Sequence, residues 1–109
     1  MIPWVQLDSA KTPDGQQELR LKRRGSEFSI MLGTNELMNS RLSGSEQALA
    51  KLSAGRVGKR PKARVLIGGL GMGFTLRAAQ GCFGADSELV VGELVPEIIA
   101  WARGPLTPV

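Results

Sequence analysis

The sequence contains no histidine, and its single cysteine is Cys82. One cysteine cannot form an internal disulfide, and without histidine the usual Cys/His zinc sites have no ligand set. Nucleophile systems that pair serine or cysteine with histidine are excluded for the same reason. We expect Cys82 to be a small, partly buried apolar side chain near the end of a helix rather than a reactive thiol.

Long apolar runs are also missing. No stretch approaches the roughly 20 residues that a membrane-spanning helix needs. The opening residues Met1-Ile2-Pro3-Trp4 lack the basic-then-apolar order of a signal peptide. The composition, 42% hydrophobic and 22% charged, is typical of a globular protein. We therefore expect one cytoplasmic domain, or a piece of one, with no membrane partner.

The net charge of +4 is unevenly distributed. Residues 1–64 hold 12 Lys/Arg and 6 Asp/Glu, whereas residues 65–109 hold 2 and 4. Most of the basic excess lies in residues 22–24 and 56–64, a pattern that a nucleic-acid surface would share. Neither cluster has an aromatic residue interleaved with it, so base stacking has no support. We expect both clusters to be solvated, and nucleic acid not to be a partner.

The first part of the chain predicts a small antiparallel sheet. Residues 1–17 are rich in Pro, Asp and Gln and predict an irregular arm, with Thr12-Pro13-Asp14-Gly15 as a turn. Residues 18–24 and 27–32 alternate between apolar and polar positions on either side of Gly25-Ser26, which predicts a hairpin. Residues 36–41 predict a third strand.

A helix and a basic linker follow this sheet. Residues 43–46 have the S-x-x-E form of a capping box. Ala48, Leu49 and Leu52 recur at helical spacing, and Gly55 provides a stop, so we expect a helix over residues 44–54. Residues 55–63 combine glycine, proline and basic residues, which predicts a linker.

The pattern then changes to that of an α/β fold. Residues 65–67 and 89–91 are short, uninterrupted apolar runs, which suit strands of a parallel sheet that are buried on both faces. Helices are expected over residues 73–80, ended by Gly81 and Gly84, and over residues 97–103, with Pro96 in the first turn. Leu76, Ala79 and Phe83 should face inward from the first of these helices. The β-α-β-α order predicts a Rossmann-like parallel sheet, incomplete in this chain.

Glycines at 68, 69, 71 and 73 lie between the first of these strands and its helix. Glycine there permits a tight turn and lets a ligand approach bare backbone, while the helix N-terminus favours negative groups. The loop lacks the lysine of a P-loop. It also fails the dinucleotide pattern G-x-G-x-x-G, because Phe74 or Leu76 would occupy the last glycine position. The spacing that fits is G-x-G-x-G at Gly69, Gly71 and Gly73.

Glu93 follows the second strand, 20 residues beyond Gly73. An acidic residue at this strand end can accept hydrogen bonds from both hydroxyls of a ribose. Strand, glycine loop, helix, strand and acid occur in the order that a nucleoside site requires. The alternative is a glycine-rich turn followed by a surface glutamate.

These segments resemble a known family. Residues 65–77, Val-Leu-Ile-Gly-Gly-Leu-Gly-Met-Gly-Phe-Thr-Leu-Arg, resemble the first nucleotide-binding motif of spermidine synthases and of the wider class I S-adenosyl-methionine-dependent methyltransferases. Residues 92–97 are similar to the family's ribose-binding acidic segment. Residues 17–21 are similar to the stretch in which the family places a ligand-contacting Gln, here Gln17, and residues 36–49 are similar to the stretch that leads into the first helix.

The resemblance covers about residues 17–104 and implies a transferase of polyamine biosynthesis or a methyltransferase. Its ligand would be S-adenosyl-methionine or decarboxylated S-adenosyl-methionine, held by Gly69, Gly71, Gly73, Glu93 and Gln17. Gly44-Ser45 replaces the family's Tyr-His pair, and Met72 occupies the acidic position of the glycine loop. The family's catalytic Asp has no counterpart here, so we expect an N-terminal fragment that is inactive alone.

The domain organisation expected from these patterns has three parts. Residues 1–42 form an arm and an antiparallel sheet, residues 43–63 a helix and basic linker, and residues 64–109 a partial nucleoside-binding domain. Glu36 and Glu46 are available acids, although each suits a surface or capping role better than that of a base. Because two parallel strands leave an open edge, we expect a homo-oligomer. The alternative functions are a non-catalytic nucleoside-binding or dimerisation module and a basic nucleic-acid-binding domain.

Overall fold

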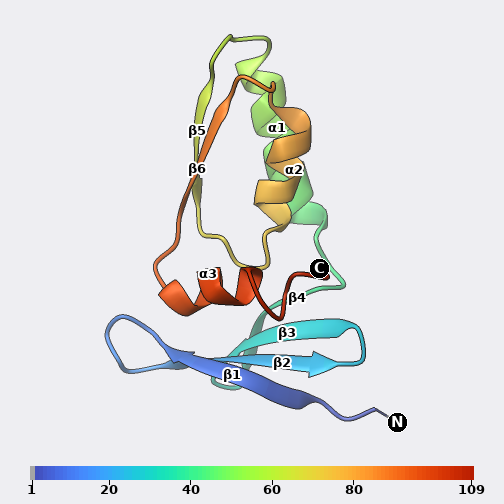
Figure 1. The fold of residues 1–109 in the computed structure, drawn as a ribbon, viewed down its shortest axis with the longest axis vertical. Helices are drawn as coiled ribbons and strands as arrows, with labels where there is room; N and C mark the ends of the chain where they lie inside the picture. The colour runs from blue at the N-terminus through green and yellow to red at the C-terminus, as the bar shows by residue number, and fades with distance from the viewer. Residues whose placement is uncertain (1) are drawn as a thin grey trace. The chain divides into compact units, whose positions relative to one another are not determined.

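The structure, a computed structural model, describes residues 2–109 as an α/β fold with three helices and two sheets (Figure 1). One sheet has four antiparallel strands and the other has two parallel strands. The chain divides into two compact units. The first contains residues 2–42 and 94–109, and the second contains residues 43–93.

The sheet of the first unit runs in chain order through β1 (Val5–Lys11), β2 (Glu18–Arg24), β3 (Glu27–Leu32) and β4 (Asn35–Asn39). The hairpin predicted around residue 25 is confirmed, and Gly25 and Gly33 take the positive φ (+59° each) of tight turns. The last strand ends at Asn39 rather than at residue 41. The side-chain oxygen of Asn39 accepts hydrogen bonds from the backbone N–H groups of Arg41 and Leu42, so the chain turns after Asn39.

The irregular arm expected over residues 1–17 is wrong for residues 5–11, whereas the turn expected at residues 12–15 is present. Val5–Lys11 is a strand that pairs with β2, with an irregularity in the register between Gln6 and Asp8. The segment carries few apolar residues, and of its seven residues only Ala10 is buried. Its strand conformation therefore comes from pairing with β2 rather than from a pattern of its own.

One face of this sheet carries the apolar residues. Leu21 and Ile30 lie directly opposite each other and are fully buried. Asp8 lies opposite Leu21 on the next strand, and its carboxylate accepts a hydrogen bond of 2.8 Å from the indole Nε1 of Trp101. Trp101 belongs to α3 (Pro96–Ala102) and is only 2% exposed. The indole is thus fixed against this face at its polar end as well as by burial. The other buried apolar residues of the unit are Ala10, Leu19, Phe28, Val95, Ile98 and Leu106.

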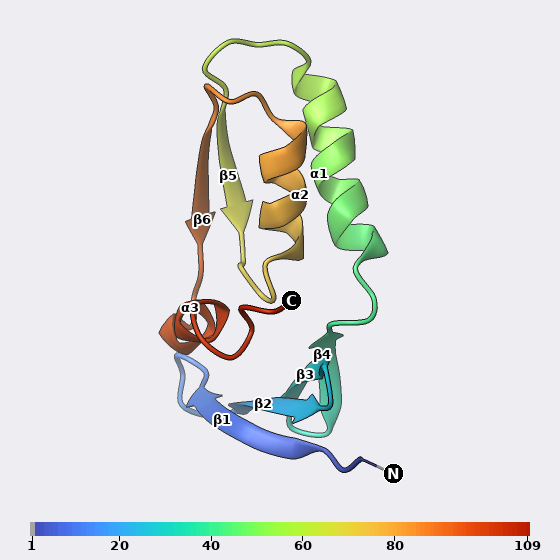
Figure 2. The same ribbon diagram turned by 45° about the vertical axis from the view of Figure 1, so that its right-hand side comes forward.

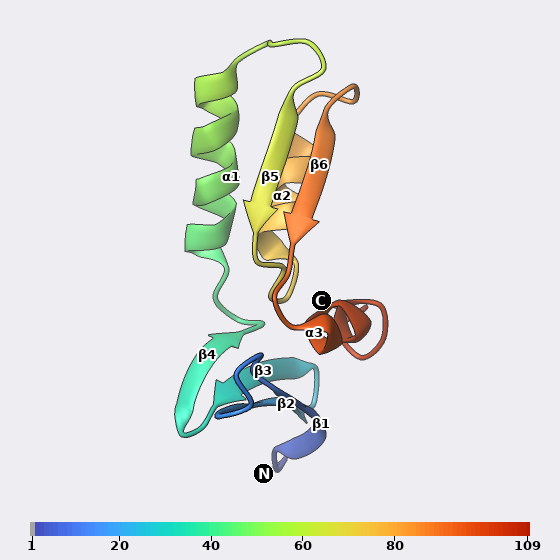
Figure 3. The same ribbon diagram turned by 90° about the vertical axis from the view of Figure 1, so that its left-hand side faces the viewer.

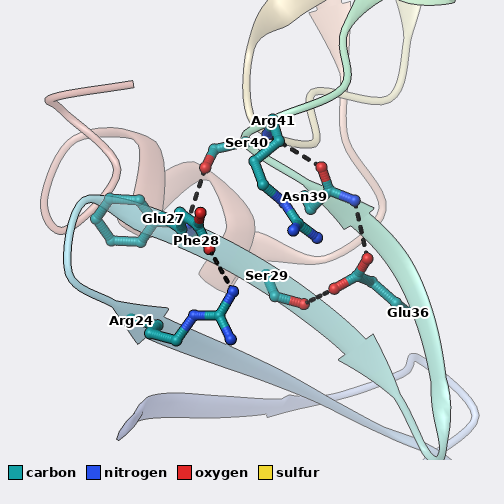
Figure 4. Close-up of polar contacts among 8 residues, drawn as sticks. All are labelled: Arg24, Glu27, Phe28, Ser29, Glu36, Asn39, Ser40 and Arg41. Carbon is teal, nitrogen blue, oxygen red and sulfur yellow. Dashed lines mark hydrogen bonds and ion pairs between the residues drawn. The ribbon is translucent and has the colours of Figure 1, made fainter. Parts of the chain in front are cut away.

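The opposite face is polar, and Ser29 is its buried member at 2% exposure. The Ser29 hydroxyl donates to Glu36 Oε2 at 2.5 Å, and the Asn39 side-chain amide donates to Glu36 Oε1 at 2.8 Å (Figure 4). The hydrogen bonds from Ser29 and then Asn39 lower the pKa of Glu36 below its ordinary value. Glu36 therefore holds two strands together as an ionised carboxylate.

Acid should destabilise the first unit through Asp8 and Glu36. The bond from Trp101 lowers the pKa of Asp8, as the bonds from Ser29 and Asn39 lower that of Glu36. A depressed native pKa gives stability that is present above the unfolded values, 3.8 for Asp8 and 4.5 for Glu36, and is lost as pH falls through the native values. We expect the urea midpoint, followed by tryptophan fluorescence, to fall between about pH 6 and about pH 3. The Asp8→Asn, Glu36→Gln double variant should lose much of this pH dependence; an unchanged dependence would contradict the assignment.

The second unit places two helices on one face of a two-stranded parallel sheet (Figure 2). Its elements are α1 (Gly44–Val57), β5 (Arg64–Gly68), α2 (Phe74–Cys82) and β6 (Glu88–Gly92). Both predicted strands and their parallel pairing are confirmed. Ala50, Ile67 and Ala79 form the core, and the residues packed against it include Leu76 and Phe83, as expected.

Burial of both faces of these strands was expected and is wrong. The face turned away from the helices is open (Figure 3), and it carries Leu66 at 75% exposure and Val90 at 45%. Leu66 and Val90 are register partners, whereas their neighbours Ile67 and Val91 face the helices. An uninterrupted apolar run therefore predicts a strand correctly here, but it does not predict that both faces of the strand are buried.

Helix α1 departs from its sequence pattern in three ways. It continues past Gly55 to Val57 and ends at Gly58, whose φ of +66° makes glycine suitable there. The capping box does not form, because the Ser43 hydroxyl accepts from the Gln47 side chain instead of a backbone N–H. The leucines that indicated the helix also point outward: Ala50 is buried, whereas Leu49 is 61% exposed and Leu52 is 72% exposed.

The later helices lie close to their expected positions. Helix α2 runs through Gly81 to Cys82, two residues further than predicted, and α3 ends one residue earlier than predicted. Cys82 is exposed, which corrects the expectation of a partly buried thiol. Because the helix continues, Cys82 stays on its outer surface.

Candidate functional site

The glycine loop between β5 and α2 owes its shape to three residues in the left-handed region. The φ angles are +89° at Gly69, +55° at Gly71 and +84° at Gly73. Residues with a Cβ adopt such angles at a cost of about 1–2 kcal/mol each. The three positions picked out by the G-x-G-x-G spacing are therefore the three at which the backbone requires glycine, while Gly68 has no positive φ.

Backbone hydrogen bonds hold this loop across the ends of both strands. The Gly69 N–H donates to the Gly92 carbonyl at 2.7 Å, which extends the β5–β6 ladder into the loop. The Gly73 N–H donates to the Leu70 carbonyl at 2.9 Å and closes a turn at the start of α2. The loop is thus a defined turn at the carboxyl edge of the parallel sheet, the edge at which open α/β sheets bind ligands.

Glu93, which directly follows β6, is hydrogen-bonded to the glycine loop. Its Oε1 accepts from the Leu70 N–H at 2.7 Å and lies 3.4 Å from the Gly71 nitrogen. Glu93 is half-buried, which strengthens a bond between a carboxylate and a backbone N–H. Two segments more than 20 residues apart in the sequence therefore meet in one site.

The start of α2 adds a second feature suited to a polar ligand. Gly73 is the N-cap residue and supplies no side-chain cap, and the first turn contains no acidic residue. A Cβ placed on Gly69 or Gly73 would meet no atom within 4 Å, so the space in front of these glycines is open. Met72, in the acidic position of the family pattern, is only 7% exposed.

The remaining acids and amides named from sequence lie elsewhere. Gln17 is in the β1–β2 turn of the first unit, where its backbone N–H and carbonyl bond with Thr12 and its side chain is exposed. Glu36 serves the polar face of the first sheet, and Glu46 accepts from the Ser45 hydroxyl in the first turn of α1. The structure thus joins Gly69, Gly71, Gly73 and Glu93 within one unit.

Two hollows in the second unit are not lined by Gly69, Gly71, Gly73 or Glu93. A cavity of about 160 Å³ is lined by α1, β5 and α2, and it includes Leu49, Ile67, Gly68 and Phe83. A more open groove of about 380 Å³ lies between α1 and α2 and is bordered by Lys51, Phe74, Arg77 and Cys82. We place the candidate site at the loop because the loop, rather than either hollow, combines an acid with exposed backbone.

The basic clusters are partly engaged in local contacts. Arg24 pairs with Glu27 at 2.8 Å and stacks 4.6 Å from the centre of the Trp4 ring. The sequence shows no aromatic residue within either cluster. Trp4 lies beside Arg24 because β1 pairs with β2, a contact that sequence spacing does not reveal. Arg64 lies 3.5 Å from Glu88. The Lys62 N–H donates to Asp86 at 2.8 Å, which anchors the second cluster's loop.

Within residues 2–109, no group of three or more acidic or cysteine side chains is arranged to hold a metal ion. In the same part of the chain, no helix has both the length and the apolar character needed to cross a membrane. Compared with known protein families and with curated proteins, the sequence matches none. These two comparisons therefore add no support to any functional assignment.

Proposed function

We propose that residues 43–93 form the ligand-binding part of a Rossmann-like fold that takes an S-adenosyl-methionine-type ligand, as the resemblance to the spermidine synthase family implies. The observation that carries the proposal is the bond between Glu93 and the Leu70 N–H of the glycine loop, at 2.7 Å. This bond places a strand-end acid and a bare turn in one site. The order of strand, loop, helix, strand and acid supports the same ligand class.

The parts of the ligand match the parts of the site. A carboxylate offers about four acceptor positions, so Glu93 can hold the loop and accept ribose hydroxyls together. The open faces of Gly69 and Gly73 let the sulfonium end approach the backbone. The start of α2 favours the carboxylate of S-adenosyl-methionine. Gln17 is proposed as a further ligand contact on the resemblance alone.

The reaction class that such a ligand site would serve is aminopropyl or methyl transfer. Both proceed by attack of a nucleophile on a carbon next to a sulfonium, and both depend chiefly on positioning. Aminopropyl transfer also needs a carboxylate to hold or deprotonate the amine. Glu36 and Glu46 are hydrogen-bonded to neighbouring side chains and are not proposed as the base that aminopropyl transfer needs. We therefore propose that this chain binds the ligand without turnover.

Calorimetric titration tests the ligand class. We expect saturable heat with S-adenosyl-methionine, decarboxylated S-adenosyl-methionine or methylthioadenosine, because all three carry the ribose that Glu93 would accept. NAD serves as the matched control, because the loop does not have the G-x-G-x-x-G spacing of a dinucleotide site. Absence of heat with all three nucleosides from folded protein, or equal binding of NAD, would contradict the proposal.

A further inference from the structure

Helix α1 exposes its two leucines, and its one buried residue is Ala50. Leu49 and Leu52 are 61% and 72% exposed, whereas Ala50 is 3% exposed. A helix on the surface of a single globular unit shows the reverse arrangement, with its leucines turned to the core. The outward leucines therefore require an explanation outside the packing of the second unit.

Charges at the two ends of α1 flank these leucines. Glu46 lies in the first turn and Arg56 in the last. At about 100° per residue, Glu46, Leu49, Leu52 and Arg56 fall within a band of about 120° around the helix. This band, from here the α1 band, is acidic at one end, apolar in the middle and basic at the other.

The remaining cation of the helix lies away from the α1 band. Lys51 is two residues from Leu49, or about 200° around the helix. Consistent with that position, Lys51 borders the groove between α1 and α2, whereas Leu49 lines the cavity beside β5. Of the two cations of α1, only Arg56 therefore lies in the α1 band.

We infer that the α1 band is a self-association surface whose occupant is α1 of a second copy of this chain, packed antiparallel across a two-fold axis. In that arrangement Leu49 meets Leu52 of the second copy, and Glu46 lies beside Arg56 of the second copy, each contact occurring twice. The two helix dipoles also run antiparallel, so the positive end of each lies beside the negative end of the other. Charge complementarity selects this occupant, because a parallel arrangement would place like charges together.

The expected dimer is weak. One pair of 14-residue helices buries less than the roughly 1,200–2,000 Å² of a standard interface. Sedimentation equilibrium from about 10 μM to about 1 mM covers the range in which such a contact forms. Leu52→Asp should weaken the dimer about 100-fold, because two leucine contacts are lost and two charges are buried.

The matched control is Leu94→Asp, because Leu94 is exposed to a similar degree, 75% against 72% for Leu52, but lies outside α1. It should leave self-association unchanged. Circular dichroism of each variant shows whether α1 remains folded. We expect α1 to remain folded in Leu52→Asp, because Leu52 is exposed and not part of the core.

Charge reversal separates this arrangement from general apolar adhesion. Arg56→Glu alone and Glu46→Arg alone should each weaken the dimer about tenfold, because each places like charges together twice. The double variant should restore it. A wild-type chain that stays monomeric throughout, equal weakening by Leu94→Asp, or failure of the double variant to recover would each overturn the inference, the last two in favour of a different partner for the exposed leucines.

Discussion

Glu93→Gln is expected to weaken binding of S-adenosyl-methionine by about 30- to 100-fold. The amide oxygen of glutamine can still accept from the Leu70 N–H, so the loop should keep its shape. The substitution removes the negative charge, and charge-assisted bonds to two ribose hydroxyls are worth more than neutral ones. Calorimetry at one salt concentration would measure the change.

Glu88→Gln is the matched control for Glu93→Gln, because Glu88 begins the same strand that Glu93 follows. Its carboxylate is exposed and lies beside Arg64, at the opposite end of the strand from the loop. Binding should be unchanged in this variant. Equal affinity of Glu93→Gln and wild type would show that Glu93 only shapes the loop, and equal loss in both variants would indicate an effect of overall charge.

Trp101→Ala is expected to lower the free energy of unfolding of the first unit by about 3–5 kcal/mol. The indole is 2% exposed, and its removal would leave a cavity at the buried face of the sheet as well as an unmade bond to Asp8. The total free energy of unfolding of a small domain is about 5–15 kcal/mol, so this loss would remove a large part of the stability of the unit. Urea unfolding followed by the fluorescence of Trp4, the remaining tryptophan, would measure the loss.

Trp101→Phe separates the two contributions of the indole. Phenylalanine keeps most of the buried ring but cannot donate to Asp8, whose carboxylate is exposed, so the bond itself should contribute about 1 kcal/mol. We therefore expect Trp101→Phe to be destabilised far less than Trp101→Ala. A loss below about 1 kcal/mol in Trp101→Ala would mean that the indole does not stabilise this face.

The sequence predicted the sheets better than it predicted what covers them. Alternation in residues 18–32 was sufficient for the hairpin, because one face of that sheet is apolar and the other polar. The runs at residues 65–67 and 89–91 gave the strands but not their burial, since Leu66 and Val90 belong to the same runs and are exposed. Burial depends on which elements pack on each face, and a single run of residues does not contain that information.

Long-range partners account for the other errors. Val5–Lys11 is a strand because β2 lies beside it, and its own residues are mostly exposed. Leu49 and Leu52 were named from their helical spacing, whereas the unit buries Ala50 and leaves both leucines exposed. Ala50 of α1 and Ala79 of α2 share the core of the unit, which helical spacing alone does not reveal.

The candidate site was predictable to the extent that it depends on local backbone. Gly69, Gly71 and Gly73 were named from spacing, and each has the positive φ that only glycine adopts readily. Glu93 was named as a strand-end acid, but its bond to the Leu70 N–H could not be predicted. That contact depends on how the ends of β5 and β6 meet, which the parallel register sets.

The most direct test of the proposed ligand site is a nuclear magnetic resonance titration of ¹⁵N-labelled chain with S-adenosyl-methionine. We predict that the largest shifts occur at the backbone amides of Gly69, Leu70, Gly71 and Glu93, with saturation at a single affinity. Unchanged amides at these four positions, or shifts confined to the basic loop around Lys62, would contradict a nucleoside site built on the glycine loop.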